Sequence, residues 1–305
     1  MSSQLAVWIS AARPQTLPAA VVPVAIGSAL AARDHTFALF PALLCLAFAL
    51  LVQVGTNFAN DYFDARSGAD AADRIGPTRA TASGLVRPET MWRATLLTLG
   101  LAFLVGLGLV PFGGWWLVAV GLASLACAVA YTGGPYPLGY HGWGDVFVIL
   151  FFGLIAVSMT YYVQAGSISA ASLWLGLGCG LMVNLLLIVN NYRDVEGDAR
   201  VGKRTLIVRL GRPFGRAFFA GSYLVAGGSV LAALASSLGL LQGLVVIAGW
   251  IIGGWAHIGL LQRLEQARTP ADFGAVLKTT SMEIVGYGAV VSLLTVAVGI
   301  SGRSF

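Results

Sequence analysis

Asn57-Phe-Ala-Asn60-Asp61-Tyr-Phe-Asp64 is a polar stretch that ends a long apolar segment. A second stretch of the same kind, Asn190-Asn-Tyr-Arg-Asp194-Val-Glu-Gly-Asp198, ends another apolar segment 133 residues later. Residues four apart share one face of a helix, so each stretch predicts a row of polar side chains. The predicted rows are Asn57, Asp61 and Asp64 in the first stretch and Asn190, Asp194 and Asp198 in the second. Brought together, the two rows would offer four carboxylates to divalent cations.

The composition indicates an integral membrane protein. Hydrophobic residues make up 57% of the chain and charged residues 10%, against roughly a quarter charged in a soluble domain. Nine apolar segments are each near the roughly 20 residues that cross a bilayer. They lie at about 17–32, 37–59, 92–111, 115–132, 145–164, 171–191, 216–236, 240–261 and 284–301. No linker with a compositional break divides them, so we expect an all-α protein with a single domain, 1–305, and nine transmembrane helices around a central cavity.

The distribution of charge predicts the topology. If the nine segments alternate, 16 of the 18 Lys and Arg residues fall on the side that holds the N-terminus, and only Arg33 and Arg303 fall on the other. The positive-inside rule places the charged side in the cytoplasm, with the N-terminus inside and the C-terminus outside. A cleaved signal peptide at 17–32 is the alternative, but Pro14, Pro18 and Pro23 favour a retained helix. The net charge of +5 then reflects topology and attraction to anionic lipid, and no nucleic-acid module is visible.

The two acidic stretches form a weak internal repeat. They end the second and sixth segments, which run in the same direction if the segments alternate. Each is followed by a long basic loop, with Arg74, Arg79 and Arg87 after the first and Lys203, Arg204 and Arg209 after the second. Repeats related by an axis along the membrane normal would bring both stretches to one cavity mouth.

Carboxylates beside Lys and Arg have a specific use at a membrane surface. Mg²⁺ is commonly held by a few carboxylates together with substrate phosphate oxygens. Basic side chains bind the remaining oxygens and stabilise charge on a departing diphosphate. The alternative is a pair of solvated helix ends whose ion pairs contribute under about 1 kcal/mol. Two motifs at matching depth, each with basic followers, favour the functional interpretation.

The chain resembles the UbiA-type intramembrane prenyltransferases over nearly its whole length, and most of all the 1,4-dihydroxy-2-naphthoate polyprenyltransferases of menaquinone biosynthesis. The similar stretches are Ala12–Ala19, Asn60–Asp64 with Gly68–Asp70, Arg74–Arg79, Tyr131–Leu138 and Lys203–Thr205. The resemblance implies a bundle of nine helices in the cytoplasmic membrane of a bacterium. It also implies transfer of a polyprenyl group from polyprenyl diphosphate to an aromatic acid, with Mg²⁺ as cofactor.

The resemblance also implies roles for particular residues. The metal ligands, acting through the diphosphate, would be Asp61, Asp64, Asp194 and Asp198. Hydrogen-bonding or charge partners of the diphosphate would be Asn57, Asn60, Asn190, Arg79, Lys203 and Arg204, of which Arg79 and Lys203 would be catalytic. Many relatives carry a third acid where this chain has Gly68. Asp70 and Asp73 lie slightly further on, so a metal-binding role for either is open.

Several other residues have a structural interpretation as well as a role in the site. Tyr131, Tyr136 and Tyr140 are candidates for shielding an allylic cation or placing the substrate, or they are interfacial anchors. Arg13 is a candidate for the acceptor carboxylate, or a topology anchor. Asp145 either favours a helix start or contacts the acceptor. Lys278 flanks the last segment, where it is a charged exit.

Two other functions compete with this one. A prenyltransferase of the same type could use another acceptor, such as 4-hydroxybenzoate, homogentisate or haem. A transporter could also carry acids in membrane segments, but transport sites lie near the midplane, whereas these acids end their segments. The favoured interpretation is attack of 1,4-dihydroxy-2-naphthoate on the prenyl donor with loss of CO₂ and diphosphate, giving demethylmenaquinol.

Overall fold

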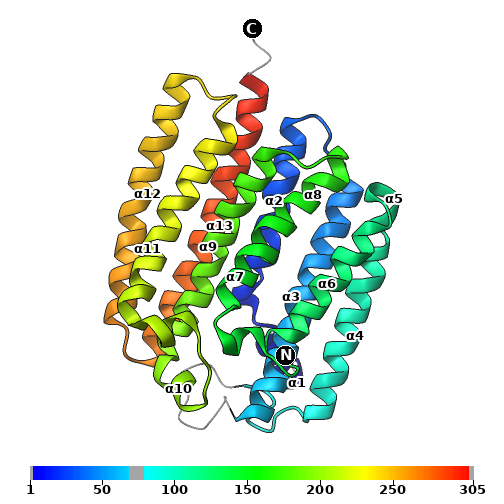
Figure 1. Ribbon diagram of the computed structural model, residues 1–305, viewed down its shortest axis with the longest axis vertical. Helices are drawn as coiled ribbons and strands as arrows, with labels where there is room; N and C mark the ends of the chain where they lie inside the picture. The colour runs from blue at the N-terminus through cyan, green and yellow to red at the C-terminus, as the bar shows by residue number, and fades with distance from the viewer. Residues whose placement is uncertain (1–2, 69–78, 302–305) are drawn as a thin grey trace.

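The secondary structure is helical throughout the computed structural model of this protein, which describes residues 3–68 and 79–301 (Figure 1). The long helices run roughly parallel or antiparallel as one bundle. Within the described residues there is no strand, so the predicted all-α class is confirmed. In chain order the elements are α1 (Ser3–Ala12), η1 (Pro14–Thr16), α2 (Pro18–Arg33), α3 (Leu39–Ser67), α4 (Pro88–Leu107), α5 (Val110–Gly113), α6 (Trp116–Ala130), η2 (Leu138–His141), α7 (Gly144–Val148), η3 (Ile149–Ile155), α8 (Ala156–Ala165), α9 (Ala170–Arg193), α10 (Val195–Arg200), α11 (Leu206–Leu234), α12 (Leu240–Gln266) and α13 (Pro270–Ser301).

Seven helical spans of the described chain are long and apolar enough to cross a membrane. The first predicted segment differs because α1 and α2 meet at a bend of 48°. The bend lies between Thr16 and Pro18; Arg13, just before it, separates α1 from η1 with φ 51°, in the left-handed region that interrupts a helix. The fourth predicted segment, α6, is apolar but has only 15 residues. The count is therefore seven, or eight if the bent pair crosses as one span.

The bundle is centred on α9. Inside the structure, 78% of the most apolar part of α9 is buried, against 11% for α12. Leu185, Ile188 and Val189 of α9 are fully buried, whereas Ile252 and Trp255 of α12 are more than half exposed. A helix that is apolar all round and exposed in the structure presents that surface to lipid. The integral membrane class predicted from composition agrees with this arrangement.

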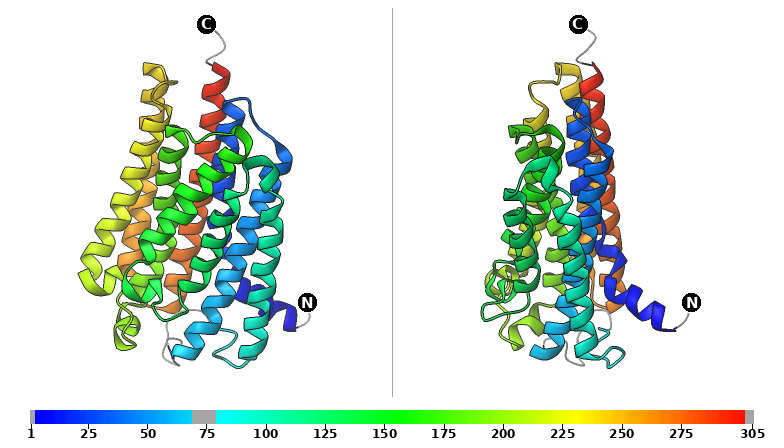
Figure 2. Two further views of the ribbon diagram at one scale, coloured as in Figure 1. Left: turned by 45° about the vertical axis from the view of Figure 1, so that its right-hand side comes forward. Right: turned by 90° about the vertical axis from the view of Figure 1, so that its right-hand side faces the viewer.

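Both acidic stretches lie at the same end of the bundle, here called the motif end. The views in Figures 1 and 2 show the C-terminal ends of α3 and α9 there, together with α10 and α1. The final turns of α13 lie at the opposite end. This placement is what two parallel repeats would give, because α3 and α9 run in the same direction.

Several helices extend beyond their predicted bounds at the motif end. The second predicted segment ends at 59, but α3 continues to Ser67 and stops at Gly68, whose φ of 74° suits a glycine. The seventh begins ten residues earlier than predicted, because the Thr205 hydroxyl accepts from the Val208 amide and caps α11. Gly211, at φ 82° and ψ 168°, interrupts α11 and separates its first residues from the longer apolar part of the helix. Polar residues thus continue helices past the apolar runs.

A π-helical segment, η3, interrupts the span between Gly144 and Ala165. It packs directly on α9 through glycines. A Cβ on Gly153 would lie 2.4 Å from the Gly176 carbonyl oxygen and 2.5 Å from the Gly180 Cα. Small residues allow this close backbone approach. The widened turn carries Phe151 and Phe152 into the wall of the cavity.

A buried polar contact joins the lipid-facing α12 to its neighbours. The His257 Nδ1 lies 2.8 Å from Glu283 Oε1 on α13, and its Nε2 lies 3.2 Å from the Phe219 carbonyl oxygen on α11. The ring stacks on Phe219 and on Tyr223 at centroid distances of 4.7 and 4.6 Å. His257 therefore has a packing role.

Candidate active site

A cavity of about 410 Å³ runs from the motif end into the bundle. Its walls come chiefly from α2, α3, α6, η3, α8 and α9. Most of the predicted site residues line it: Arg13, Asn57, Asn60, Asp61, Asp64, Arg79, Tyr131, Asn190, Asp194, Asp198 and Lys203. Away from the motif end the lining is apolar, and includes Cys45, Phe48, Phe103, Leu107 and Leu117. The predicted central cavity is present, with charged side chains at the motif end and mainly apolar side chains along the rest.

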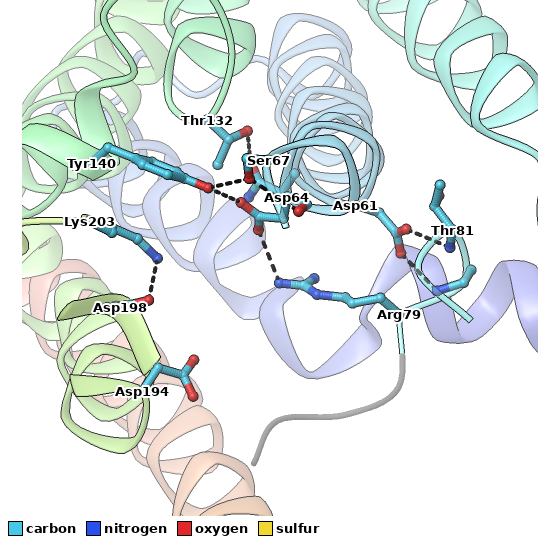
Figure 3. Close-up of polar contacts among 12 residues, drawn as sticks. Asp61, Asp64, Ser67, Arg79, Thr81, Thr132, Tyr140, Asp194, Asp198 and Lys203 are labelled. Carbon is cyan, nitrogen blue, oxygen red and sulfur yellow. Dashed lines mark hydrogen bonds and ion pairs between the residues drawn. The ribbon is translucent and has the colours of Figure 1, made fainter. Parts of the chain in front are cut away.

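The first acidic stretch is divided between two faces of α3. Asp64 faces the second stretch: Tyr140 donates its hydroxyl to Asp64 Oδ1 at 3.1 Å, and Arg79 Nη2 lies 3.5 Å from Asp64 Oδ2. The Thr132 hydroxyl donates to Asn60 Oδ1 at 2.8 Å. Figure 3 shows Asp64 directed towards Lys203 and Asp198.

Asn57 and Asp61 form the other face. Asn57 donates its side-chain amide to the Ala12 carbonyl at 2.9 Å, and Asp61 accepts the backbone N–H groups of Ala80 and Thr81 at 3.1 and 2.8 Å. In Figure 3, Asp61 points away from Asp194 and Asp198. The predicted row of Asn57, Asp61 and Asp64 lines the cavity, but its members have different partners: Asp61 bonds the turn at Ala80, and Asp64 bonds Tyr140 and Arg79. Three residues of helix turn by about 300°, so Asp61 and Asp64 differ in direction by about 60°.

The second stretch breaks its helix at Asp194. This residue has φ −92° and ψ 9°, and it separates α9 from α10. The prediction of one continuous helix face for Asn190, Asp194 and Asp198 is corrected accordingly, although the Asp198 amide still donates to the Asp194 carbonyl at 2.7 Å. Arg193 donates two hydrogen bonds of 2.7 Å to the Asp194 carboxylate. Asn190 donates to the Leu186 carbonyl at 2.9 Å.

The carboxylate of Asp198 is only partly hydrogen-bonded within the site. Its Oδ1 lies 3.3 Å from Lys203 Nζ, and its buried Oδ2 has no hydrogen-bond partner. Burial raises the pKa of Asp198; Lys203 opposes the shift, while the carboxylates of Asp194 and Asp64 add to it. A buried carboxylate with two other carboxylates close to it favours a cation among them.

The residues present fit a hard divalent cation held jointly with a substrate. Carboxylate oxygens are the ligands Mg²⁺ prefers, and Asp198 Oδ2 is a buried oxygen in need of a partner. Among residues 3–68 and 79–301, however, no three His, Cys, Asp or Glu side chains are close enough to hold an ion by themselves. Phosphate oxygens would have to complete the coordination.

The three predicted tyrosines differ in position. Tyr131 lines the cavity. Tyr140 lies beside the cavity, bonded to Asp64, and Lys203 Nζ sits 5.6 Å from its ring centroid. Tyr136 is half exposed and stacks on His141 instead. Its predicted role stays a prediction, as does that of Arg204, which is exposed and does not line the cavity.

Sequence reasoning passed over several lining residues. Arg193 is 4% exposed and borders the cavity, and Thr132 holds Asn60. A lone Arg in an apolar helix end resembles an ordinary topology marker, so only its deep burial distinguishes it.

Among the residues left open by the sequence, Asp145 is also buried, and it accepts from the Asn184 side-chain amide at 3.0 Å; Lys278 is exposed. Asp70, Asp73 and Arg74 lie outside the described residues.

Known proteins share both sequence and fold with this chain. The model of the UbiA prenyltransferase family matches residues 20–281. A 1,4-dihydroxy-2-naphthoate octaprenyltransferase of Mycobacterium leprae is 34% identical over 97% of this chain and 98% of its own. The enzyme of the same name from Mycobacterium tuberculosis is 42% identical over 74% of this chain and 77% of its own. That of Escherichia coli is 40% identical over 72% and 73%.

Solved structures show the same architecture at low sequence identity. A UbiA homologue from Archaeoglobus fulgidus, solved with GPP and Mg²⁺, superposes with a TM-score of 0.66 at 12% identity and covers 98% of this chain and 100% of its own. The same homologue solved with DMAPP and Mg²⁺ gives a TM-score of 0.64 at 13% identity over 97% and 99%. With the sequence matches, these results establish that the chain belongs to the UbiA prenyltransferase family.

Proposed function

We propose that this protein is a Mg²⁺-dependent polyprenyltransferase that joins the prenyl group of a polyprenyl diphosphate to 1,4-dihydroxy-2-naphthoate, with loss of CO₂ and diphosphate, giving demethylmenaquinol. One observation carries the proposal: a single cavity has carboxylates and cationic side chains at the motif end and apolar side chains along the rest. Such a lining matches a donor with a charged head and a hydrocarbon tail. The acceptor is supported by the names of relatives that are 34–42% identical.

The charged end provides for the diphosphate. Asp64, Asp194 and Asp198 would hold Mg²⁺ together with diphosphate oxygens, and Mg²⁺ would supply neutralising charge for the leaving group. Lys203 and Arg79 line the same end and would bind the remaining oxygens. Asn60 and Asn190 are amide partners of the same substrate. The cations stabilise the charge that develops as the diphosphate departs.

The bond changes balance without a redox partner. The bond between the allylic carbon and the diphosphate oxygen breaks, and its electrons leave with the diphosphate. The ring carbon that bears the carboxylate of the acceptor attacks the allylic carbon. The carboxylate is then lost as CO₂, and the electrons of that bond restore the aromatic ring.

The apolar walls would shield the allylic cation from water. Phe147 and Phe151 line the cavity and lie nearly parallel, with centroids 5.9 Å apart. Aromatic faces attract cations, so these rings and Tyr131 are suited to the reacting end of the prenyl chain. Arg13, also in the lining, is the proposed partner of the acceptor carboxylate.

We also propose that all nine predicted segments cross the cytoplasmic membrane of a bacterium, with the motif end in the cytoplasm. The start of α1 and the end of α13 lie at opposite ends of the bundle (Figure 1), in keeping with an internal N-terminus and an external C-terminus. Cysteines placed singly at Gly202 and Gly239 of a cysteine-free variant test this. A membrane-impermeant maleimide added to whole cells should label only the second.

The decisive experiment follows the acceptor carboxylate. Purified protein is incubated with Mg²⁺, a polyprenyl diphosphate and carboxyl-labelled 1,4-dihydroxy-2-naphthoate, and products are identified by mass. We expect one labelled CO₂ for each prenylated product. Carboxyl-labelled 4-hydroxybenzoate is the matched control, because its prenylation at a neighbouring ring carbon retains the label. Prenylation of the control alone would replace the proposed acceptor.

A further inference from the structure

A row of three α3 side chains, Gln53, Asn57 and Asp61, binds two segments that flank the cavity. All three are nearly buried, at 6%, 3% and 1% exposure. Gln53 and Asn57 donate to the Thr16 hydroxyl at 2.9 and 3.0 Å, and Asn57 also donates to the Ala12 carbonyl. The upper part of the row therefore fixes the junction between α1 and α2. The side-chain N–H groups of Gln53 and Asn57 are thus bonded within the protein.

Asp61, the last member of the row, binds a turn formed by residues 79–86. Its two carboxylate oxygens each accept one backbone N–H, from Ala80 and from Thr81. The turn closes on itself, because the Val86 amide donates to the Ala80 carbonyl at 3.0 Å. Ala80 and Val86 are buried against Phe58, Met91 and Ala11 in a small core at the motif end.

The residue just before these two amides is Arg79. Its guanidinium lies 3.5 Å from Asp64 and borders the cavity, with only 11% of the side chain exposed. The backbone that carries this cation is thus held by Asp61, while the cation itself meets Asp64. Figure 3 shows the two carboxylates on different sides of α3, joined through Arg79 and the turn.

We propose that Asp61 is a positioning residue that holds Arg79 in the diphosphate site, and that Asp64 is the α3 carboxylate that contacts the metal and diphosphate. This assignment rests on the proposed function for the identity of the substrate. It replaces the metal-ligand role that the resemblance implied for Asp61. An acceptor-only carboxylate is suited to two N–H donors, whereas an asparagine in its place accepts one and turns its own N–H₂ towards the other.

The first arm of the test needs no substrate. Amide hydrogen exchange is followed by mass spectrometry on the full chain in lipid nanodiscs for wild type, Asp61→Asn and Asp64→Asn. We expect peptides that cover 80–86 to exchange about tenfold faster in Asp61→Asn, as for the loss of about one hydrogen bond. In Asp64→Asn they should exchange as in wild type. Equal exchange in wild type and Asp61→Asn would overturn the proposal, whatever the acceptor is.

The second arm separates positioning from metal binding. For Asp61→Asn we expect the KM for prenyl diphosphate to rise about tenfold, with the Mg²⁺ concentration at half-maximal rate within about twofold of wild type. Asp64→Asn should raise that Mg²⁺ concentration. The double variant Asp61→Asn/Arg79→Ala should be no worse than Arg79→Ala alone, because Asp61 acts through Arg79. A raised Mg²⁺ requirement in Asp61→Asn, or multiplied defects in the double variant, would show a metal ligand.

A third variant leaves the carboxylate intact. Thr81→Pro removes one of the two N–H donors, and proline is a common residue in turns such as this one. It should reproduce the raised KM for prenyl diphosphate and leave the Mg²⁺ requirement unchanged. A wild-type KM in Thr81→Pro would contradict the assignment. This variant also decides the matter if Asp61→Asn does not fold. If wild type prenylates no aromatic acid, the exchange arm still tests Asp61 while the proposed function fails.

Discussion

Replacing Gly153 by alanine should damage both stability and activity, because the site wall depends on its close approach to α9. The added Cβ would lie 2.4 Å from the Gly176 carbonyl oxygen, 2.5 Å from the Gly180 Cα and 2.7 Å from the Gly180 nitrogen. All three are backbone atoms, so none can rotate away. Ordinary contact begins near 3.4 Å, which requires η3 and α9 to separate by about 1 Å.

Overpacking of this kind costs about 1–3 kcal/mol. At about 2–4 °C per kcal/mol, a loss of about 2 kcal/mol lowers the midpoint of thermal unfolding by roughly 4–8 °C. The same displacement moves Phe151 and Phe152 in the cavity wall. Misplacement by about 1 Å can reduce turnover by about 10²-fold.

Thermal unfolding in detergent, monitored by tryptophan fluorescence, and steady-state kinetics of the same preparation measure the two effects. Gly228→Ala on α11 is the matched control, since nothing lies within 4 Å of its Cβ position. There alanine should be neutral or stabilising by up to about 1 kcal/mol. A Gly153→Ala variant with wild-type midpoint and wild-type kcat/KM would refute the reasoning about the glycine contact.

Three further outcomes follow from the charged end of the cavity. Lys203→Met should lower kcat/KM for prenyl diphosphate by about 10²–10³-fold with little change in KM for the acceptor, and Lys203→Arg should retain more activity; steady-state kinetics with each substrate varied separately decide this. Tyr140→Phe removes the hydroxyl that donates to Asp64 at 3.1 Å and lies 2.8 Å from the Ser67 hydroxyl, so a loss of about three- to tenfold in kcat/KM is expected, and a loss as large as that of Lys203→Met would indicate direct contact with substrate. Burial raises the pKa of Asp198, so this carboxyl holds its proton to a higher pH than an ordinary aspartate. Activity at limiting Mg²⁺ should therefore fall as the pH falls towards that raised pKa, and saturating Mg²⁺ should move the fall to lower pH; a pH profile independent of Mg²⁺ would contradict it.

The bundle was largely predictable from sequence because lipid imposes a simple rule on it. Each apolar run of sufficient length became a helix, and the two acidic stretches met at one end as the parallel repeat predicted. The helix ends at the motif end were less predictable, because α3 and α11 continue through polar residues beyond their apolar runs. Composition also does not reveal the left-handed conformation of Arg13, which separates α1 from η1 just before the bend.

The division of labour within the first acidic stretch could not be predicted from spacing. Asp61 and Asp64 differ by less than one turn of helix, and both rows look equivalent in the sequence. What separates them is a turn some 20 residues later that returns to Asp61 through Ala80 and Thr81. In the same way, Asp194 looks like the next member of a helix face but ends its helix, with Arg193 on its carboxylate. A long-range contact decides the first case, and local backbone geometry decides the second.

The apolar length of the cavity has an energetic consequence for the proposed prenyl donor. The lining of the cavity extends along α3 from Asp64 to Cys45, roughly 28 Å at 1.5 Å per residue, and its α3 side chains are apolar from Val52 to Cys45, roughly 11 Å. Moving one five-carbon unit from hydrocarbon to water costs roughly 4 kcal/mol at about 0.8 kcal/mol per carbon. An enzyme that drew its donor into the aqueous phase would meet that cost for every unit of the chain. A tail that exchanges lipid for this protein wall meets almost none of it, so lengthening the donor should change its effective concentration in the bilayer more than its intrinsic affinity for the enzyme.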